Sequence, residues 1–213
     1  MIIHNGAVMR AEKLDSSTRR RQILEAALQL IAEAGANRLN MAGLARRVGL
    51  VTSGLYRHFD SKDAVLDAAI GLIGQRLQSE VEAARQEGKT ALDQLRQLLR
   101  RHVALIRTNA GIPRLVFSEA VFSDDPSRRQ NIRRVIERYM DQISALIHEG
   151  QKSGQIRNDL DPRTVAVMFL GLVQPMAILW RVTDGRFDVT RHTHKSWEIF
   201  EAMLRPDSTG DDA

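Results

Sequence analysis

The chain has 213 residues, an ordinary apolar content of 43%, few glycines and prolines, and no cysteine. This length and composition are typical of a globular protein of one or two domains, and they exclude disulfides, thiolate-bound zinc and cysteine nucleophiles. Charge is uneven, because residues 1–62 carry ten Lys or Arg against five Asp or Glu, whereas residues 63–213 carry 21 of each. A basic end on a neutral body indicates that this end binds a polyanion, and duplex DNA is the polyanion that it suits best.

The sequence predicts no targeting or membrane segment. Residues 1–9 are short, uncharged and interrupted by polar residues, unlike a secretory signal, and Met9 is an alternative start to Met1. The longest apolar run, residues 164–180, is short for a bilayer span and contains Pro175. We therefore expect a cytoplasmic protein without membrane contact.

Apolar residues recur at helical spacing along nearly the whole chain, and no alternating strand pattern of useful length occurs. The first apolar stripe begins after Thr18 and ends at Gly35, with polar capping residues before it and glycine behind it. Nine helices without a strand predict an all-α fold. After the first, the spacing predicts helices over residues 41–48, 52–58, 61–87, 90–108, 113–122, 126–150, 162–180 and 191–204.

Residues 40–59 have the pattern of a helix-turn-helix. Asn40 can cap its first helix, and Gly49 stands where the turn favours positive φ. Leu55 and Phe59, four residues apart, would lock the second helix onto the core. The exposed side of that helix, where a DNA major groove would lie, then carries Thr52, Ser53, Gly54, Tyr56, Arg57 and His58.

Three runs at fixed spacing resemble the DNA-binding domain of the TetR (tetracycline-repressor) family of bacterial transcriptional regulators. They are RRQILEAA at residues 20–27, LARRVGL at 44–50 and LYRHFDSKD at 55–63. The resemblance covers about a quarter of the chain, and the rest agrees in length and helical layout. It divides the chain into an N-terminal arm (1–15), a helix-turn-helix domain (16–63), a helical ligand-binding and dimerisation domain (64–205) and an acidic tail (206–213).

The resemblance implies roles for residues of the helix-turn-helix. Tyr56 and Lys62 are expected to bind DNA phosphates, and Asn40, with the first amides of its helix, is expected to contact the DNA backbone. Base edges or flanking phosphates would be contacted by Arg46, Arg47, Thr52, Ser53 and Arg57, because arginine is the commonest direct reader of guanine.

Three positions depart from the family pattern, and the one at Met41, where a β-branched residue or Leu is more usual, matters little. Val51 stands where a capping Ser or Thr is common, so we expect Thr52 to take the capping role. Gly54 costs roughly 1 kcal/mol of helix stability relative to alanine, and it either lets the backbone approach DNA closely or weakens binding. The basic stretch from Arg10 through Lys13 to Arg21 either contacts DNA or is a solvated tail.

The C-terminal half contains a helix that is apolar on almost every side, residues 165–180. Such a helix should be buried all round, and in the family the last two helices form a four-helix bundle with a partner subunit. The alternative is that these residues fill a monomer core. The expected dimer interface comprises Val165, Met168, Leu172, Leu179, Trp180, Trp197, Phe200 and Leu204.

In regulators of this family a small molecule enters the C-terminal domain and changes the spacing of the DNA-reading helices. Bulky or polar residues on apolar faces are the candidates for the pocket, although any one such residue is more often ordinary core. The buried polar groups among them are the most informative, because they need a partner. The set comprises His102, Phe117, Phe122, Tyr139, Phe169, Gln174 and Met176.

Enzymatic and metal-binding functions have little support in the sequence. There is no phosphate-binding glycine loop and no nucleophile elbow, and His192 and His194 lack further ligands, so we expect no cofactor and no metal. The sequence therefore predicts a TetR-like regulator that represses from a palindromic operator as a homodimer and is released by a small-molecule inducer. The alternative is an architectural or adaptor DNA-binding protein of the same fold without a ligand.

The phosphate contacts give a first test. Tyr56→Phe and Lys62→Ala should each weaken binding to any DNA duplex, and Lys62→Ala should lower the slope of log affinity against log salt by about one. Filter binding over a salt series measures both. Circular dichroism and sedimentation should show unchanged helix content and dimerisation, and loss of either would make these residues structural instead.

Overall fold

The computed structural model describes residues 15–122 and 125–206, and these residues form ten α-helices and one 3₁₀ helix without a strand. The all-α prediction is confirmed. The predicted arm (apart from residue 15) and nearly all of the acidic tail lie outside the described residues. The helices are α1 (Ser16–Ala34), η1 (Ala36–Arg38), α2 (Met41–Arg47), α3 (Thr52–Tyr56), α4 (Lys62–Glu87), α5 (Ala91–Thr108), α6 (Gly111–Val116), α7 (Glu119–Phe122), α8 (Pro126–Lys152), α9 (Pro162–Val182) and α10 (Val189–Leu204).

The predicted helix over residues 113–122 is in fact two helices. α6 ends at Val116, where both the N–H (3.0 Å) and the hydroxyl (2.7 Å) of Ser118 donate to the Leu115 carbonyl. A serine that bonds the nearby backbone in this way competes with the helical hydrogen-bond ladder. This break separates α7 from α6 and explains why ten α-helices form instead of nine.

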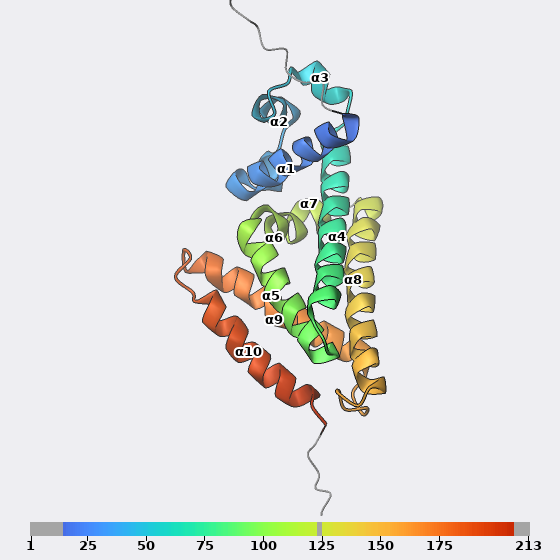
Figure 1. Cartoon of the computed structure of the whole chain (residues 1–213). Coiled ribbons are helices and arrows are strands. Elements are labelled where there is room, and N and C mark those ends of the chain that lie inside the picture. The colour runs from blue at the N-terminus through green and yellow to red at the C-terminus, as the bar shows by residue number, and fades with distance from the viewer. Residues whose placement is uncertain (1–14, 123–124, 207–213) are drawn as a thin grey trace, which may run out of the picture.

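Helices α1 to α3 form a compact head (residues 15–61) at one end of the molecule, and α4 runs from it down the body (residues 62–206) beside α8 (Figure 1). The core of the head does not stop at the predicted boundary between residues 63 and 64. It continues through the first half of α4 and includes Leu105, Ile112, Leu115, Val121 and Ile132 of the body. A second core joins the other half of α4 to α5, α8, α9 and α10.

The short helix α6 packs directly beneath α1. A Cβ atom at Gly111 would lie 2.1 Å from the Leu28 carbonyl oxygen, so only glycine allows this approach. Arg114 donates to the carbonyls of Ala32 and Ile31 at the end of α1, whose last carbonyls have no partner within the helix. α6 is therefore bonded to the head as well as to the body.

A buried arginine ties α8 to the start of α4. Arg128 is 4% exposed, and its guanidinium bonds Asp63 (2.6 Å) and Asp67 (3.1 Å) of α4 and the Ala120 carbonyl (3.0 Å). Asp125, the N-cap residue of α8, lies 3.5 Å away on the same guanidinium. Removing one partner of such a buried cluster leaves an uncompensated charge, so the contact fixes α4 against α8.

The close approach of α1 and α6 predicts a stability difference between two glycines. Gly111→Ala should lower the free energy of unfolding by about 1–3 kcal/mol, because the new methyl group overlaps the α1 backbone. Gly71→Ala is the matched control, since a Cβ there meets nothing within 4 Å, and it should raise stability by roughly 0.5–1 kcal/mol. Urea unfolding of both variants checks this, and equal stabilities would contradict the packing.

Candidate functional site

The second helix of the helix-turn-helix presents a polar face to solvent. Gly49 has a φ of +69°, as the turn was predicted to need, and Leu55 and Phe59 are buried in the head. The side chains left exposed are those of Thr52, Ser53, Tyr56 and Arg57, whereas Gly54 and His58 are half-buried. The predicted capping role of Thr52 is wrong, because α3 begins at Thr52 with Val51 as its N-cap and no side-chain cap.

Asn40 caps α2 and Arg46 lies exposed on that helix, as the sequence predicted, whereas Arg47 is held in an ion pair. The Asn40 side chain accepts from the Gly43 N–H (2.8 Å), which caps α2. Arg46 is exposed, whereas Arg47 makes a bidentate ion pair with Glu33 of α1 (2.9 and 2.6 Å). Arg47 therefore has to leave a good partner before it can bind DNA, and Arg46 does not.

Two basic residues have structural contacts that the sequence pattern did not indicate. Arg20 lies in α1 instead of in a basic arm, and its guanidinium sits 4.1 Å above the Phe59 ring and donates to the His58 carbonyl. Lys62 donates to the Asn37 carbonyl (2.9 Å). Both contacts hold the ends of α3 and α4 against the rest of the head, so Lys62 has a structural bond in addition to any phosphate contact.

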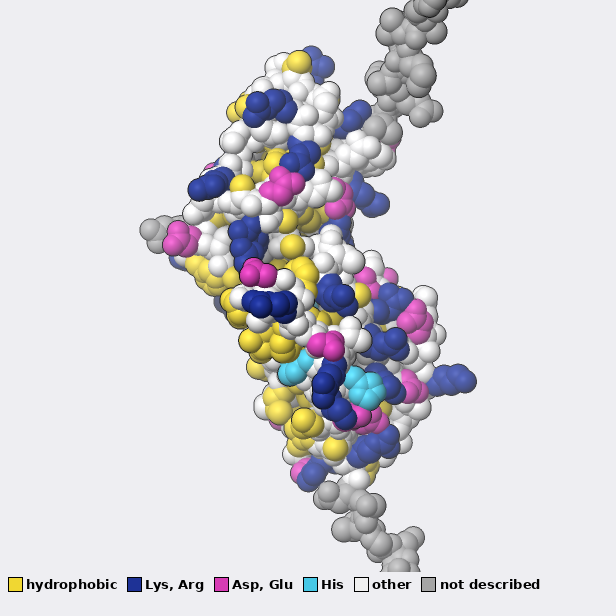
Figure 2. Space-filling view, turned by 90° about the vertical axis from the view of Figure 1, so that its left-hand side faces the viewer, with side chains coloured by type: hydrophobic (Ala, Val, Ile, Leu, Met, Phe, Trp, Pro, Cys, Tyr) yellow, Lys and Arg dark blue, Asp and Glu magenta, His cyan; other side chains and the backbone are white. Residues whose placement is uncertain are grey.

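Basic side chains are spread over the head end of the molecule in the space-filling view (Figure 2). The exposed ones that belong to the helix-turn-helix are Arg46, Arg47 and Arg57, of which Arg47 is the one paired with Glu33. Together with the Tyr56 hydroxyl and the start of α2, they make a surface that can bind phosphates and reach base edges.

The body contains a mainly apolar cavity of about 90 Å³ between α4, α5, α6, α8 and α9. Four of the seven predicted ligand residues line it, namely His102, Phe117, Tyr139 and Gln174. Phe169 and Met176 instead belong to the second core, and Phe122 is exposed on α7 away from the cavity. Gln174 is exposed, and not buried as the sequence suggested.

His102 and Tyr139 form a buried polar pair in the wall of this cavity. The Tyr139 hydroxyl and His102 Nδ1 are 2.9 Å apart, and the two rings meet edge to face. Burial lowers the pKa of His102 to about 4 and raises the pKa of Tyr139. Both groups are therefore uncharged at neutral pH and can only donate or accept hydrogen bonds.

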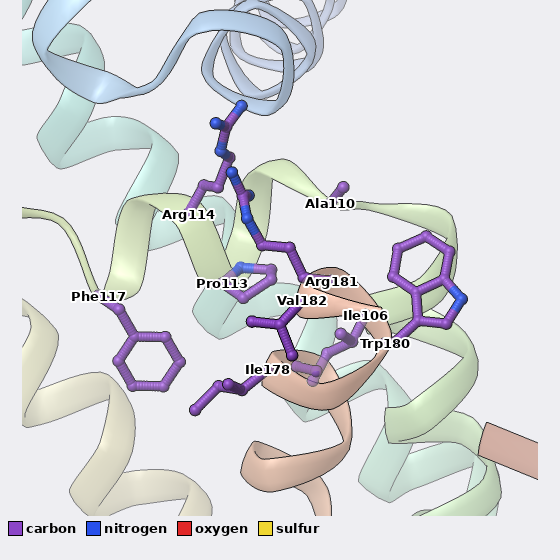
Figure 3. A pocket seen from close by; sticks show the side chains of 10 residues that line it. Ile106, Ala110, Pro113, Arg114, Phe117, Ile178, Trp180, Arg181 and Val182 are labelled. Carbon is purple, nitrogen blue, oxygen red and sulfur yellow. The ribbon is translucent and has the colours of Figure 1, made fainter. Parts of the chain in front are cut away.

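A larger recess of about 350 Å³ adjoins the cavity between α5, α6 and α9. Figure 3 shows Phe117, Ile178 and Val182 around it, while the side chains of Arg114 and Arg181 extend toward the head. The recess and the cavity share four lining residues, Ile106, Pro113, Phe117 and Ala177.

The predicted dimer residues separate into two groups. Val165, Trp197, Phe200 and Leu204 are buried in the protomer's own core, which leaves them no surface for a partner. Met168 and Leu179 are exposed on the outer face of α9, and Leu172 and Trp180 are half-buried. Hydrophobic side chains gather down one side of the body in Figure 2, and the exposed apolar residues of α9 are Val167, Met168, Ile178, Leu179 and Val182.

Comparison with known proteins gives matches along most of the chain. The family model of bacterial regulatory proteins of the tetR family matches residues 23–69, and that of the tetracyclin repressor-like C-terminal domain matches residues 88–204. Nucleoid occlusion factor SlmA of Vibrio vulnificus (strain YJ016) is 26% identical over 190 residues, which cover 89% of this chain and 97% of that protein.

Solved structures show the same fold. FadR from Bacillus subtilis in complex with stearoyl-CoA has a TM-score of 0.72 at 22% identity, over 87% of this chain and 99% of that chain. AibR in complex with isovaleryl coenzyme A and operator DNA has a TM-score of 0.69 at 23% identity, over 85% of this chain and 97% of that chain.

Burial of His102 predicts a pH dependence of stability. The folded protein keeps His102 neutral down to about pH 4, whereas the unfolded chain protonates it near the ordinary value of 6.5. Since the unfolded state binds more protons in this window, the free energy of unfolding should fall as pH drops below about 6.5, by roughly 1 kcal/mol per pH unit at most.

Urea unfolding between about pH 7 and pH 5 measures this dependence. His102→Gln, which keeps a hydrogen-bonding group beside Tyr139, should remove part of the slope. An unchanged slope in this variant would show that another group is responsible.

Proposed function

This chain belongs to the TetR family of bacterial regulatory proteins, and we propose that it is a transcriptional repressor that a small molecule releases from a palindromic operator. The family assignment makes it a DNA-binding regulator with a helix-turn-helix head. The repressing action, the operator symmetry, the inducer and a place of action at the nucleoid in the cytoplasm are parts of the proposal.

One observation carries the proposal: α4 and α6 line the cavity and also hold the head. The cavity is lined by Ile73 and Leu77 of α4 and by Ile112 and Val116 of α6. On the head side, Arg114 of α6 bonds the end of α1. A ligand that changes the spacing of α4 and α6 must therefore move the head.

Arg76 provides a second link between α4 and the head. Its guanidinium bonds Glu25 of α1 and Asn109 (2.8 Å), which lies just before α6. α1, α4 and the segment leading into α6 thus meet at one side chain. This arrangement supports coupling, because release requires only that the ligand bind the DNA-incompetent arrangement more tightly.

The outer face of α9 supports a dimer. Between Arg163 and Arg181 the helix carries no charged residue, and Met168 and Leu179 are 45% and 38% exposed. In length and composition α9 is the one helix of the described residues that could cross a membrane. Its inner face packs against α5, α8 and α10, so a partner subunit covers the outer face better than lipid would.

A dimer also suits operator binding, because two recognition helices must enter successive major grooves roughly 34–36 Å apart. The FadR and AibR structures hold coenzyme A thioesters, which makes this ligand chemistry the first to test on this chain.

The similarity to SlmA, which extends over nearly the full length of both chains, favours a second candidate function. In that case the chain would be a DNA-bound nucleoid occlusion or adaptor protein without an inducer. The two candidates differ in one measurable respect, since only the repressor loses operator affinity when a ligand binds.

Selection of sheared genomic DNA by the purified protein, followed by sequencing, tests the proposal. Enrichment of a few palindromic sites next to genes supports a repressor, and the neighbouring genes then suggest the ligand. Sites distributed around the chromosome without relation to promoters would favour nucleoid occlusion. Binding that follows only the salt concentration would contradict both.

The dimer surface gives a further prediction. Leu179→Glu should convert the dimer to a monomer and lower operator affinity at least tenfold, because a charge is placed in the centre of an apolar interface. Phe122→Glu is the control, since Phe122 is exposed on α7 and not on α9. Sedimentation velocity gives the mass, and a dimeric Leu179→Glu variant would exclude this face.

A further inference from the structure

We propose that the regulatory ligand is an acyl compound with an anionic head group, whose carbonyl binds His102 and whose head group binds Arg134 and Arg138. The inference rests on the proposed function as a ligand-released regulator. It adds the chemical class of the ligand and the side chains that recognise each part of it.

Three hollows of the body lie next to one another and share lining residues. A polar groove of about 280 Å³ lies between α4 and α8, and it shares Leu77, Val135 and Tyr139 with the apolar cavity. The cavity in turn adjoins the recess of about 350 Å³ between α5, α6 and α9. We place the ligand along these three hollows, with its polar end in the groove and its apolar end toward the recess.

Two glycines of α4 line the groove and differ in the space beside them. Gly71 and Gly74, one helical turn apart, both line it. A Cβ atom at Gly74 would lie 3.0 Å from Val135 Cγ2 of α8. The two helices thus approach closely at Gly74, while Gly71 has no neighbour within 4 Å and leaves space beside it.

The groove has two arginines that are available to an anion. Arg134 and Arg138 are exposed one turn apart on α8, and neither has a hydrogen bond or ion pair to the described part of the chain. Their neighbour Arg133, by contrast, is bonded to Glu137 (2.8 Å). Two guanidinium groups side by side can bind a phosphate or a carboxylate through several donors at once.

Beyond the groove, the polar side chains that line the cavity are those of His102, Tyr139 and the exposed Gln174. His102 is 9% exposed, and its Nδ1 is occupied by the Tyr139 hydroxyl. No described residue pairs with Nε2, and no side-chain nitrogen or oxygen of the described residues is sealed from solvent without a partner. Nε2 therefore opens into the cavity that His102 lines.

The Nε2 atom of His102 is suited to bind a carbonyl oxygen of the ligand. When the Tyr139 hydroxyl donates to Nδ1, the neutral imidazole carries its proton on Nε2 and donates it to an oxygen. A neutral donor in an apolar wall suits an uncharged ester, thioester or carboxyl carbonyl, whereas the charged end of the ligand is better placed at the arginines. Beyond His102, Ile106, Phe117 and Ala177 provide apolar surface for an acyl chain.

Calorimetric titration of the purified dimer with decanoyl-coenzyme A, decanoate and coenzyme A tests the inference. Decanoyl-coenzyme A should bind, and coenzyme A alone should bind much more weakly because it has no acyl chain. Decanoate should also bind much more weakly, because its single carboxylate cannot be at His102 and at the two arginines at once.

Variants then locate the two ends of the ligand. Arg134→Gln combined with Arg138→Gln should weaken binding at least tenfold, whereas Arg133→Gln, on the same helix but already paired, should change it less than about twofold. His102→Phe should weaken binding by about tenfold and His102→Gln by less, because glutamine restores a donor. Thermal unfolding shows whether each variant is folded.

Three results would overturn the inference: no binding of decanoyl-coenzyme A at millimolar concentration, binding of decanoate as tight as that of the thioester, or equal affinities for wild type and the Arg134 and Arg138 double variant. Operator binding by the same preparations keeps this separate from the proposed function. Operator binding without acyl binding would contradict only the proposed ligand class. If acyl compounds bind with the expected variant pattern but operator affinity does not fall, the ligand class is supported. The proposed release from the operator is then contradicted.

Discussion

The arrangement of this protein depends on the packing of α1 against α4 and α6, because the head has no complete core of its own. Its buried residues continue into the first half of α4 and into α6, α7 and α8. Gly111 allows the backbones of α1 and α6 to touch, and Arg128 fixes the start of α4 against α8. We therefore propose that the position of the head and the shape of the cavity change together.

Features that depend on local sequence could be predicted. The cap at Asn40, the turn at Gly49 and the burial of Leu55 and Phe59 all follow from short-range spacing, and so do most helix limits. The contacts that the sequence did not reveal join residues far apart in the chain. Nothing in the periodicity indicates that Arg47 pairs with Glu33, or that Lys62 bonds Asn37.

The same limit applies to the site in the body. Apolar spacing predicts that a face is buried, but not whether the protomer, a partner or a ligand buries it. Trp197 and Phe200 thus fill the protomer's own core, and of the predicted ligand residues only four line the cavity. α9 contributes side chains to two surfaces. Gln174 and Ala177 line the cavity, whereas Met168 and Leu179 are exposed on the outside of the protomer. A ligand can therefore affect the dimer as well as the head.

The most direct test of this coupling is the distance between the two heads of the dimer. The chain has no cysteine, so Gln29→Cys on the exposed face of α1 gives one spin label per head. Pulsed electron resonance should give one narrow distance in the operator complex and a different distance when a ligand that releases the operator is bound. One unchanged distance in both states would contradict the account, because the cavity and the head would then move independently.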